Sequence, residues 1–160
     1  MLAAIAFTGL LAVGASLIFD DHTANGTDDG ARDRAGALCT SAHDRLATLP
    51  PLNDVHGIAT AGPEVVDVTV STARQLLELD APAERAASIR AYARRLLRQA
   101  SLTSRLQQAA RARDRRRAVA LIEQITANSR AGRPEGAAVA PECGGIVRPS
   151  EPATPTPQAV

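Results

Sequence analysis

After Phe19 the sequence contains a single aromatic residue, Tyr92, and this scarcity limits the folds that the chain can adopt. Hydrophobic residues make up 45% of the 160 residues, yet Phe, Trp and Tyr together make up only 2%. A core must therefore be built from Leu, Ile, Val and Ala. Such side chains suit the close packing of helices, whereas a β-sandwich depends on aromatic and β-branched residues. The composition predicts an all-α fold.

Apolar residues recur at helical spacing in four segments. They predict helices over about 33–49 and 63–79, a third helix that begins after Asp80 with Pro82 in its first turn and continues to about 112, and a fourth over about 115–131. The four helices would pack as a small antiparallel bundle. At 65–72 most residues are β-branched, and a short strand competes there with the helix. The apolar face of the third segment shifts near Ser101, so that helix either breaks at 101–104 or turns a second face to another neighbour. We favour a continuous helix.

Local signals predict where these helices begin and end. Pro63 suits the first position of the second helix, while Asp80 and Asp114 suit the caps of the third and fourth. The run Gly-Arg-Pro at 132–134 is typical of a helix end.

No charged side chain occurs in residues 1–19, which as a helix span roughly 28 Å, close to the ~30 Å hydrocarbon core of a bilayer. We expect either a transmembrane helix with the remaining chain outside, or a signal segment. Cleavage after the small residues Val13-Gly14-Ala15 would remove residues 1–15 and yield a secreted protein. The acidic flank at Asp20 and Asp21 places the following chain outside. The run lacks a preceding Lys or Arg, and a buried core helix is the third interpretation.

The remaining chain divides by composition. Residues 20–33 are polar and rich in Asp and Gly, which is typical of a flexible stalk. Residues 34–147 contain the periodic apolar segments and predict one helical bundle domain. The prolines of residues 148–160 predict a disordered tail.

Two cysteines, Cys39 and Cys143, stand near opposite ends of the bundle domain. An even number of cysteines in a chain expected outside the cytoplasm favours one disulfide. The alternatives are two free thiols or half of a metal site, although neither cysteine has a second one at the spacing of zinc ligands.

The order of these features resembles small exported two-cysteine helical proteins of actinobacteria. The resemblance rests on the apolar start, the polar stalk, a first helix with Cys39 that ends Leu49-Pro50-Pro51, and the closing sequence Pro141-Glu142-Cys143-Gly144. Most such proteins have no assigned function, so the resemblance implies no catalytic residues. Many of them begin with a lipid-attachment cysteine, which this sequence lacks.

No catalytic, cofactor-binding or metal-binding motif is found in the sequence. His22, His43 and His56 lack the spacing of metal ligands, and no Gly-x-Ser-x-Gly nucleophile motif accompanies them. We therefore expect a non-enzymatic protein without cofactor or metal.

All 18 basic residues are arginines, and several follow one helix. Arg90, Arg94, Arg98 and Arg105 fall within about 80° of one another on a continuous helix. Such a positive face suits an anionic envelope polymer, a lipid headgroup or an acidic protein. A solvated face is the simpler interpretation, because the net charge of the chain is only +1. Nucleic acid is disfavoured by the expected compartment and by the lack of stacking aromatic residues among the arginines.

Together these features predict an envelope-associated protein outside the cytoplasm, attached to the membrane through residues 1–19 or secreted. The favoured function is a non-enzymatic interaction or structural module whose arginine face binds an anionic partner. The alternative is a helical bundle that encloses a small ligand, which requires a deep pocket with convergent polar groups.

Overall fold

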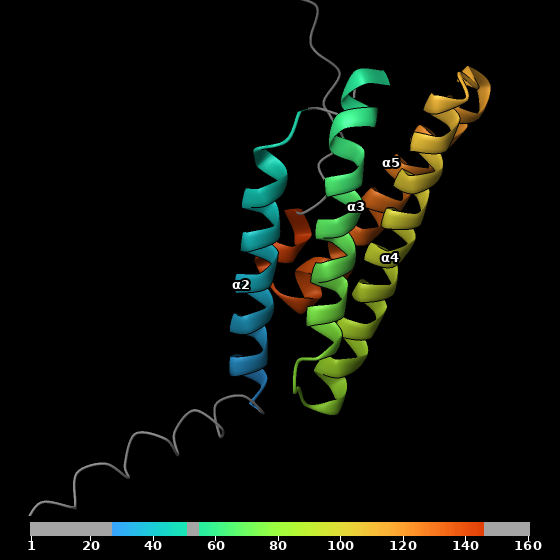
Figure 1. Ribbon diagram of the computed structural model, residues 1–160. Helices are drawn as coiled ribbons and strands as arrows, with labels where there is room; N and C mark the ends of the chain where they lie inside the picture. The colour runs from blue at the N-terminus through green and yellow to red at the C-terminus, as the bar shows by residue number, and fades with distance from the viewer. Residues whose placement is uncertain (1–26, 51–54, 146–160) are drawn as a thin grey trace, which may run out of the picture.

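Residues 27–50 and 55–145 are described in the computed structural model, and they are helical with no β-strand (Figure 1). The elements are α2 (Asp28–Ala47), α3 (Val55–Leu77), α4 (Ala83–Arg111), α5 (Arg115–Val139) and the 3₁₀-helix η1 (Pro141–Gly145). The predicted all-α bundle is therefore confirmed. The predicted membrane or signal segment 1–19 and the predicted tail 148–160 lie outside the described residues.

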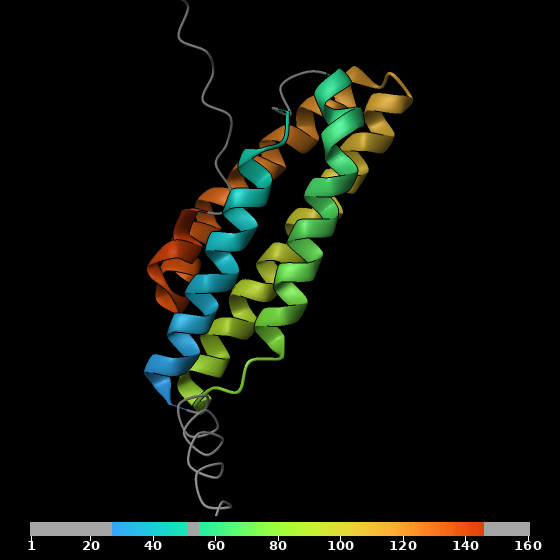
Figure 2. The same ribbon diagram turned by 60° about the vertical axis from the view of Figure 1, so that its left-hand side comes forward.

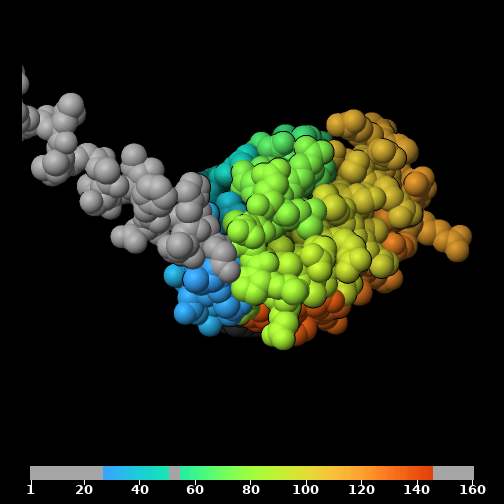
Figure 3. Space-filling view, turned by 90° about the horizontal axis from the view of Figure 1, so that it is seen from below, coloured from blue at the N-terminus to red at the C-terminus, as the bar shows by residue number. Residues whose placement is uncertain are grey.

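Successive helices run in opposite directions along the bundle (Figures 1 and 2). The most extensive contacts join α3 to α4 and α4 to α5, while α2 packs on α3 and η1. The α4–α5 turn lies at one end of the bundle. The start of α2 and the α3–α4 turn lie at the other end, which Figure 3 shows from below.

Helix α2 begins earlier than predicted. The Thr27 side chain caps it, because its Oγ1 accepts a hydrogen bond from the Gly30 amide at 3.1 Å. Asp28 and Asp29 fill the first turn, where negative charge favours the helix dipole. Residues 28–33 are thus helical and not part of a stalk, and the earlier part of the predicted stalk lies outside the described residues.

Helix α3 also begins earlier, at Val55, so Pro63 lies inside it and not at its first position. Proline has no N–H group, which leaves the carbonyl of Ala59 without its usual helical donor. The turn before the proline is nevertheless helical because Ile58 and Ala61 are buried there. Burial against α4 outweighs the local helix-breaking signal.

The strand alternative at 65–72 is wrong, since these residues lie within α3. The Thr69 and Thr72 hydroxyls donate to the carbonyl oxygens of Val65 and Val68 at 2.7 and 2.8 Å. Each bond satisfies a buried hydroxyl within its own helix, so β-branched residues are accommodated without a sheet.

Helix α4 is continuous through 101–104, as favoured. Its second apolar face packs against other helices, with Leu102 and Leu106 both buried. The predicted cap at Asp80 is wrong, because α4 follows Pro82 without a side-chain cap. Asp114 does cap α5, and its Oδ1 accepts from the Arg117 amide at 3.0 Å.

The predicted end of α5 at 132–134 is wrong, because the helix continues through Pro134 to Val139. Gly132 and Gly136 are buried where α5 crosses α4 and η1. A Cβ on Gly136 would come within 2.5 Å of the Cys143 carbonyl oxygen. Glycine at this position therefore serves close packing inside a helix, and not its termination.

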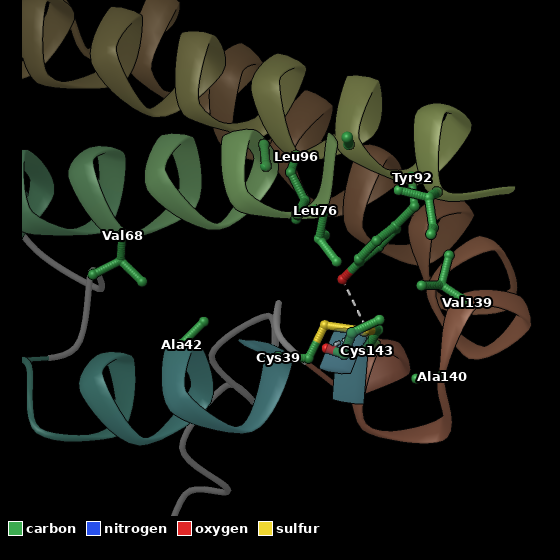
Figure 4. Close-up of a cluster of buried hydrophobic side chains, with 13 residues drawn as sticks. Cys39, Ala42, Val68, Leu76, Tyr92, Leu96, Val139, Ala140 and Cys143 are labelled. Atoms are coloured by element: carbon green, nitrogen blue, oxygen red, sulfur yellow. Dashed lines mark hydrogen bonds between the residues drawn. A yellow bond between two sulfur atoms is a disulfide. The ribbon is translucent and has the colours of Figure 1, made fainter. Parts of the chain in front are cut away.

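Two apolar clusters form the core. The first surrounds the disulfide and Tyr92 and contains residues of α2, α3, α4 and α5 (Figure 4). The second lies toward the α4–α5 turn and consists of Ile58, Leu102, Leu106, Ala109, Ala110 and Leu121. Small residues recur in both clusters, which allows the helix backbones to approach closely.

Cys39 on α2 and Cys143 on η1 form the predicted disulfide, 104 residues apart in sequence. Both cysteines are buried, and the Tyr92 hydroxyl donates a 2.6 Å hydrogen bond to the Cys143 carbonyl (Figure 4). Burial raises the pKa of Tyr92 well above its usual value. The disulfide and this hydrogen bond fasten the C-terminal end of the bundle to α2 and α4.

Candidate anion-binding surface

The four arginines predicted as a positive face all lie on the outer side of α4 and are exposed: Arg90, Arg94, Arg98 and Arg105. We call this set the arginine ridge. The opposite side of α4 carries the buried Ile89, Ala93 and Leu96. None of the ridge arginines forms an ion pair with any other residue that the structure describes. Helical spacing thus places four guanidinium groups in one row facing solvent.

Three other arginines hold helices together. Arg85 on α4 donates to both carboxylate oxygens of Asp28 on α2, at 2.8 and 2.7 Å, and also to the Ala138 carbonyl on α5 at 2.7 Å. These bonds from Arg85 lower the pKa of the Asp28 carboxyl group. Arg45 pairs with Glu64 across α2 and α3 at 2.5 Å. Arginines with a structural role in this bundle thus bond to carboxylate or carbonyl oxygens of another helix.

The third is Arg95, which directly follows Arg94 in the sequence but does not belong to the ridge. It pairs with Glu135 on α5 and lowers the pKa of that carboxyl group through the hydrogen bond. Asn128 on α5 donates to the Gln99 side-chain oxygen at 2.7 Å and to the Arg95 carbonyl at 3.3 Å. This polar network between α4 and α5 was not predicted from the sequence. The available signal was the position of Arg95 on the helix, which lies outside the arc of the ridge arginines.

Acidic residues are absent from the part of the sequence that contains the ridge. Residues 85–113 contain no Asp or Glu. Residues 83–139, which form the α4–α5 hairpin, contain 13 arginines against four acidic residues, a formal charge of +9. Residues 27–82 contain nine acidic residues against four arginines, a formal charge of −5. The small net charge of the whole chain therefore hides a strong separation of charge.

The α4–α5 turn adds further positive charge at one end of the bundle. Five exposed arginines gather there: Arg111, Arg113, Arg115, Arg116 and Arg117. Arg113 adopts the left-handed conformation with φ of 55° and so reverses the chain. The neighbouring carboxylate of Asp114 is engaged in the α5 cap.

The space between α4, α5 and η1 offers little room for a ligand. A cavity of about 10 Å³ lies between α4, α5 and η1 and is lined by Tyr92, Arg95, Gln99, Asn128 and neighbouring residues. That volume is about the size of one water molecule, whereas drug-sized ligands occupy roughly 300 Å³ or more. A wider, open groove of about 610 Å³ lies on the surface between α2 and η1, lined by polar residues such as Asp29, Asp33 and Glu142.

The two histidines in the part of the chain that the structure describes lie on different helices. His43 is half-buried on α2 and His56 is exposed on α3, while His22 precedes the described residues. Within 27–50 and 55–145, no three His, Cys, Asp or Glu side chains are arranged to hold a metal ion. The same ranges contain no helix apolar enough over sufficient length to cross a bilayer.

Comparison with known proteins finds no matching family model, no matching curated protein and no matching solved structure. The resemblance to small exported actinobacterial proteins therefore stays a prediction.

Proposed function

We propose that this protein is a non-enzymatic interaction module outside the cytoplasm that binds an anionic partner through the arginine ridge of α4. The observation that carries the proposal is the row of Arg90, Arg94, Arg98 and Arg105, exposed and without ion pairs among the described residues. Arginine binds carboxylate and phosphate groups through paired hydrogen bonds, so such a row attracts a polyanion.

The disulfide supports the proposed compartment. Disulfides form and persist mainly in oxidising environments outside the cytoplasm. The buried Cys39–Cys143 bond joins the two ends of the bundle domain, which suits a protein that must remain folded there. Attachment through residues 1–19, or secretion after their removal, is part of the same proposal.

The shape of the surface favours an extended partner. The ridge lies along the outside of a single helix and is therefore convex. An envelope polymer with repeated anionic groups can contact several arginines in turn, and each contact releases counterions from the polymer. The alternative of a small ligand enclosed between helices is not favoured, because the cavity between α4 and α5 holds about one water molecule.

Inorganic polyphosphate, labelled with a fluorophore, serves as a probe for this interaction. The variant Arg90→Gln/Arg94→Gln/Arg98→Gln should bind it more weakly than the original chain, and the slope of log K against log salt should fall by about three. The matched control is Arg32→Gln/Arg34→Gln/Arg74→Gln, which removes the same charge from exposed positions on α2 and α3. It should retain most of the affinity. Equal losses in both variants, or no binding by the original chain, would refute the proposal.

A further inference from the structure

Helix α5 exposes apolar side chains beside the arginines of the α4–α5 turn. Val119 is 50% exposed and Ile122 is 44% exposed, whereas Leu121 between them is only 1% exposed. Ile125 packs against the second core cluster together with Leu121. Helix α5 therefore has one apolar face in the core and a second apolar strip that faces solvent.

Basic residues extend this outer strip in both directions. At about 100° per residue, Arg115, Val119, Ile122, Thr126 and Arg130 fall within an arc of about 80° on α5. Arg115 and Arg130 are exposed, and Thr126 is half-buried. A helical strip with apolar residues between arginines is typical of a surface that lies on a membrane.

The acidic residues close to this surface do little to neutralise it. Asp114 accepts the Arg117 amide hydrogen bond in the α5 cap. Glu123 is exposed at the edge of the strip and forms no ion pair with another described residue. Against these two carboxylates stand the five arginines of the turn together with Arg130.

From these observations we infer that the α4–α5 turn and the outer strip of α5 dock onto the surface of a bilayer that contains anionic phospholipids. The turn arginines bind lipid phosphates, while Val119 and Ile122 enter the region between headgroups and acyl chains. The apolar pair distinguishes a bilayer from a soluble polyanion, because a polyphosphate chain offers no apolar medium. The inference rests on the proposed function because both require an anionic partner. The bilayer would be bound by the turn and the outer strip of α5, and not by the ridge.

The position of this surface is compatible with docking. The turn forms an end of the bundle, away from the start of α2 (Figures 1 and 2). A flat surface can therefore reach the turn without meeting α2.

The sequence has no tryptophan, so one introduced tryptophan reports its own surroundings in the full chain. We place it at Ile122→Trp and, as a control, at Leu77→Trp, where an exposed leucine ends α3 at the opposite end of the bundle. Each variant is mixed with vesicles of phosphatidylglycerol and phosphatidylcholine, or of phosphatidylcholine alone. On the anionic vesicles the emission of Ile122→Trp should shift to the blue and be quenched by brominated acyl chains. The emission of Leu77→Trp should change little.

In the Ile122→Trp background, adding Arg115→Gln/Arg116→Gln/Arg117→Gln should abolish the shift. Adding Arg32→Gln/Arg34→Gln/Arg74→Gln should leave it in place. An unshifted Ile122→Trp signal, or a shift at Leu77→Trp alone, would overturn the inference. Retained polyphosphate binding in that case would leave the ridge proposal standing, so the two failures are distinguishable.

Discussion

Tyr92 and Gly136 show how much of the bundle depends on contacts that single residues make around Cys143. The Tyr92 hydroxyl bonds the Cys143 carbonyl, and the absence of a side chain at Gly136 lets that carbonyl lie against α5. Neither role is visible in the sequence pattern. Tyr92 is recognisable there only as an isolated aromatic residue, and Gly136 only as a glycine near a proline.

Gly136→Ala should destabilise the protein by about 1–3 kcal/mol, because its Cβ would lie 2.5 Å from the Cys143 carbonyl oxygen and 2.9 Å from the Tyr92 ring. Gly36→Ala is the control, since its Cβ would meet the movable Glu142 carboxylate at 2.8 Å and the Ala140 Cβ at an ordinary contact distance of 3.7 Å. The control should be neutral or slightly stabilising, because alanine favours the helix. Urea unfolding followed by circular dichroism measures both, and equal stability of the two variants would contradict the packing argument.

Ionisation of Tyr92 should weaken the fold at high pH. Burial raises the pKa of Tyr92 in the folded state above the value of about 10 that a free tyrosine shows. Below pH 10 the tyrosine is neutral in both states, and above it the unfolded chain releases the proton more readily. Stability should therefore fall as the pH rises above about 10.

Tyr92→Phe tests this pH dependence. The chain has no lysine and one tyrosine, so no other side chain ordinarily titrates near pH 10 once both cysteines are in the disulfide. The variant should lose about 1–3 kcal/mol at neutral pH, because the buried Cys143 carbonyl loses its donor. Its stability should then vary less between pH 9 and 11, and an unchanged slope would contradict the assignment.

At the scale of the helices, the sequence predicted helix boundaries correctly where the signal acts locally. It predicted them wrongly where packing overrides the local signal. Asp114 is confirmed as a cap because its carboxylate needs only the first turn of α5. Pro63 and Pro134 are ordinary helix boundaries in sequence, yet both lie inside helices. A proline inside a helix costs about 3 kcal/mol relative to alanine, and tertiary burial on both sides must exceed that cost. Such burial depends on residues distant in sequence.

Two substitutions of Asp114 distinguish its effect on the stability of α5 from its effect on the charge of the turn. Asp114→Ala removes the cap and should destabilise the protein by about 1 kcal/mol. Asp114→Asn keeps a capping oxygen while removing the negative charge, so stability should change little. Both variants should bind polyphosphate more tightly, because the carboxylate stands among five arginines. Thermal unfolding and fluorescence anisotropy measure the two effects, and weaker polyphosphate binding by Asp114→Asn would contradict the assigned role of this charge.

At the scale of the whole molecule, the sequence predicted the helical bundle and the disulfide, whereas the total net charge hid the charge separation. The near absence of aromatic residues favoured helices, and the even cysteine count favoured the Cys39–Cys143 bond. The net charge of only +1 favoured the interpretation that the arginine face is merely solvated. That net charge is small because acidic residues elsewhere in the chain offset the arginines. Counts over residues 27–82 and 83–139 show the separation in the sequence itself, and the structure adds that these ranges form α2 with α3 and the α4–α5 hairpin.

Removal of the disulfide should weaken the whole bundle. The bond closes a loop of about 104 residues, for which the chain-entropy model gives a stabilisation of about 4–5 kcal/mol. Cys39→Ala/Cys143→Ala should therefore unfold at much lower urea concentration, with the sharpest loss of amide protection where η1 meets α2 and Tyr92. Hydrogen exchange maps that loss, and full stability of the double variant would contradict a fastening role.

Anions should bind the α4–α5 hairpin and not the molecule at large. All basic side chains are arginines, so the Nε–Hε signals in a nitrogen-edited NMR spectrum report on each of them during a titration with polyphosphate. The signals of Arg90, Arg94, Arg98 and Arg105 should shift at the lowest concentrations, together with those of the turn, while Arg32, Arg34 and Arg74 stay unchanged. Uniform shifts of every exposed arginine, or none on α4, would contradict the account.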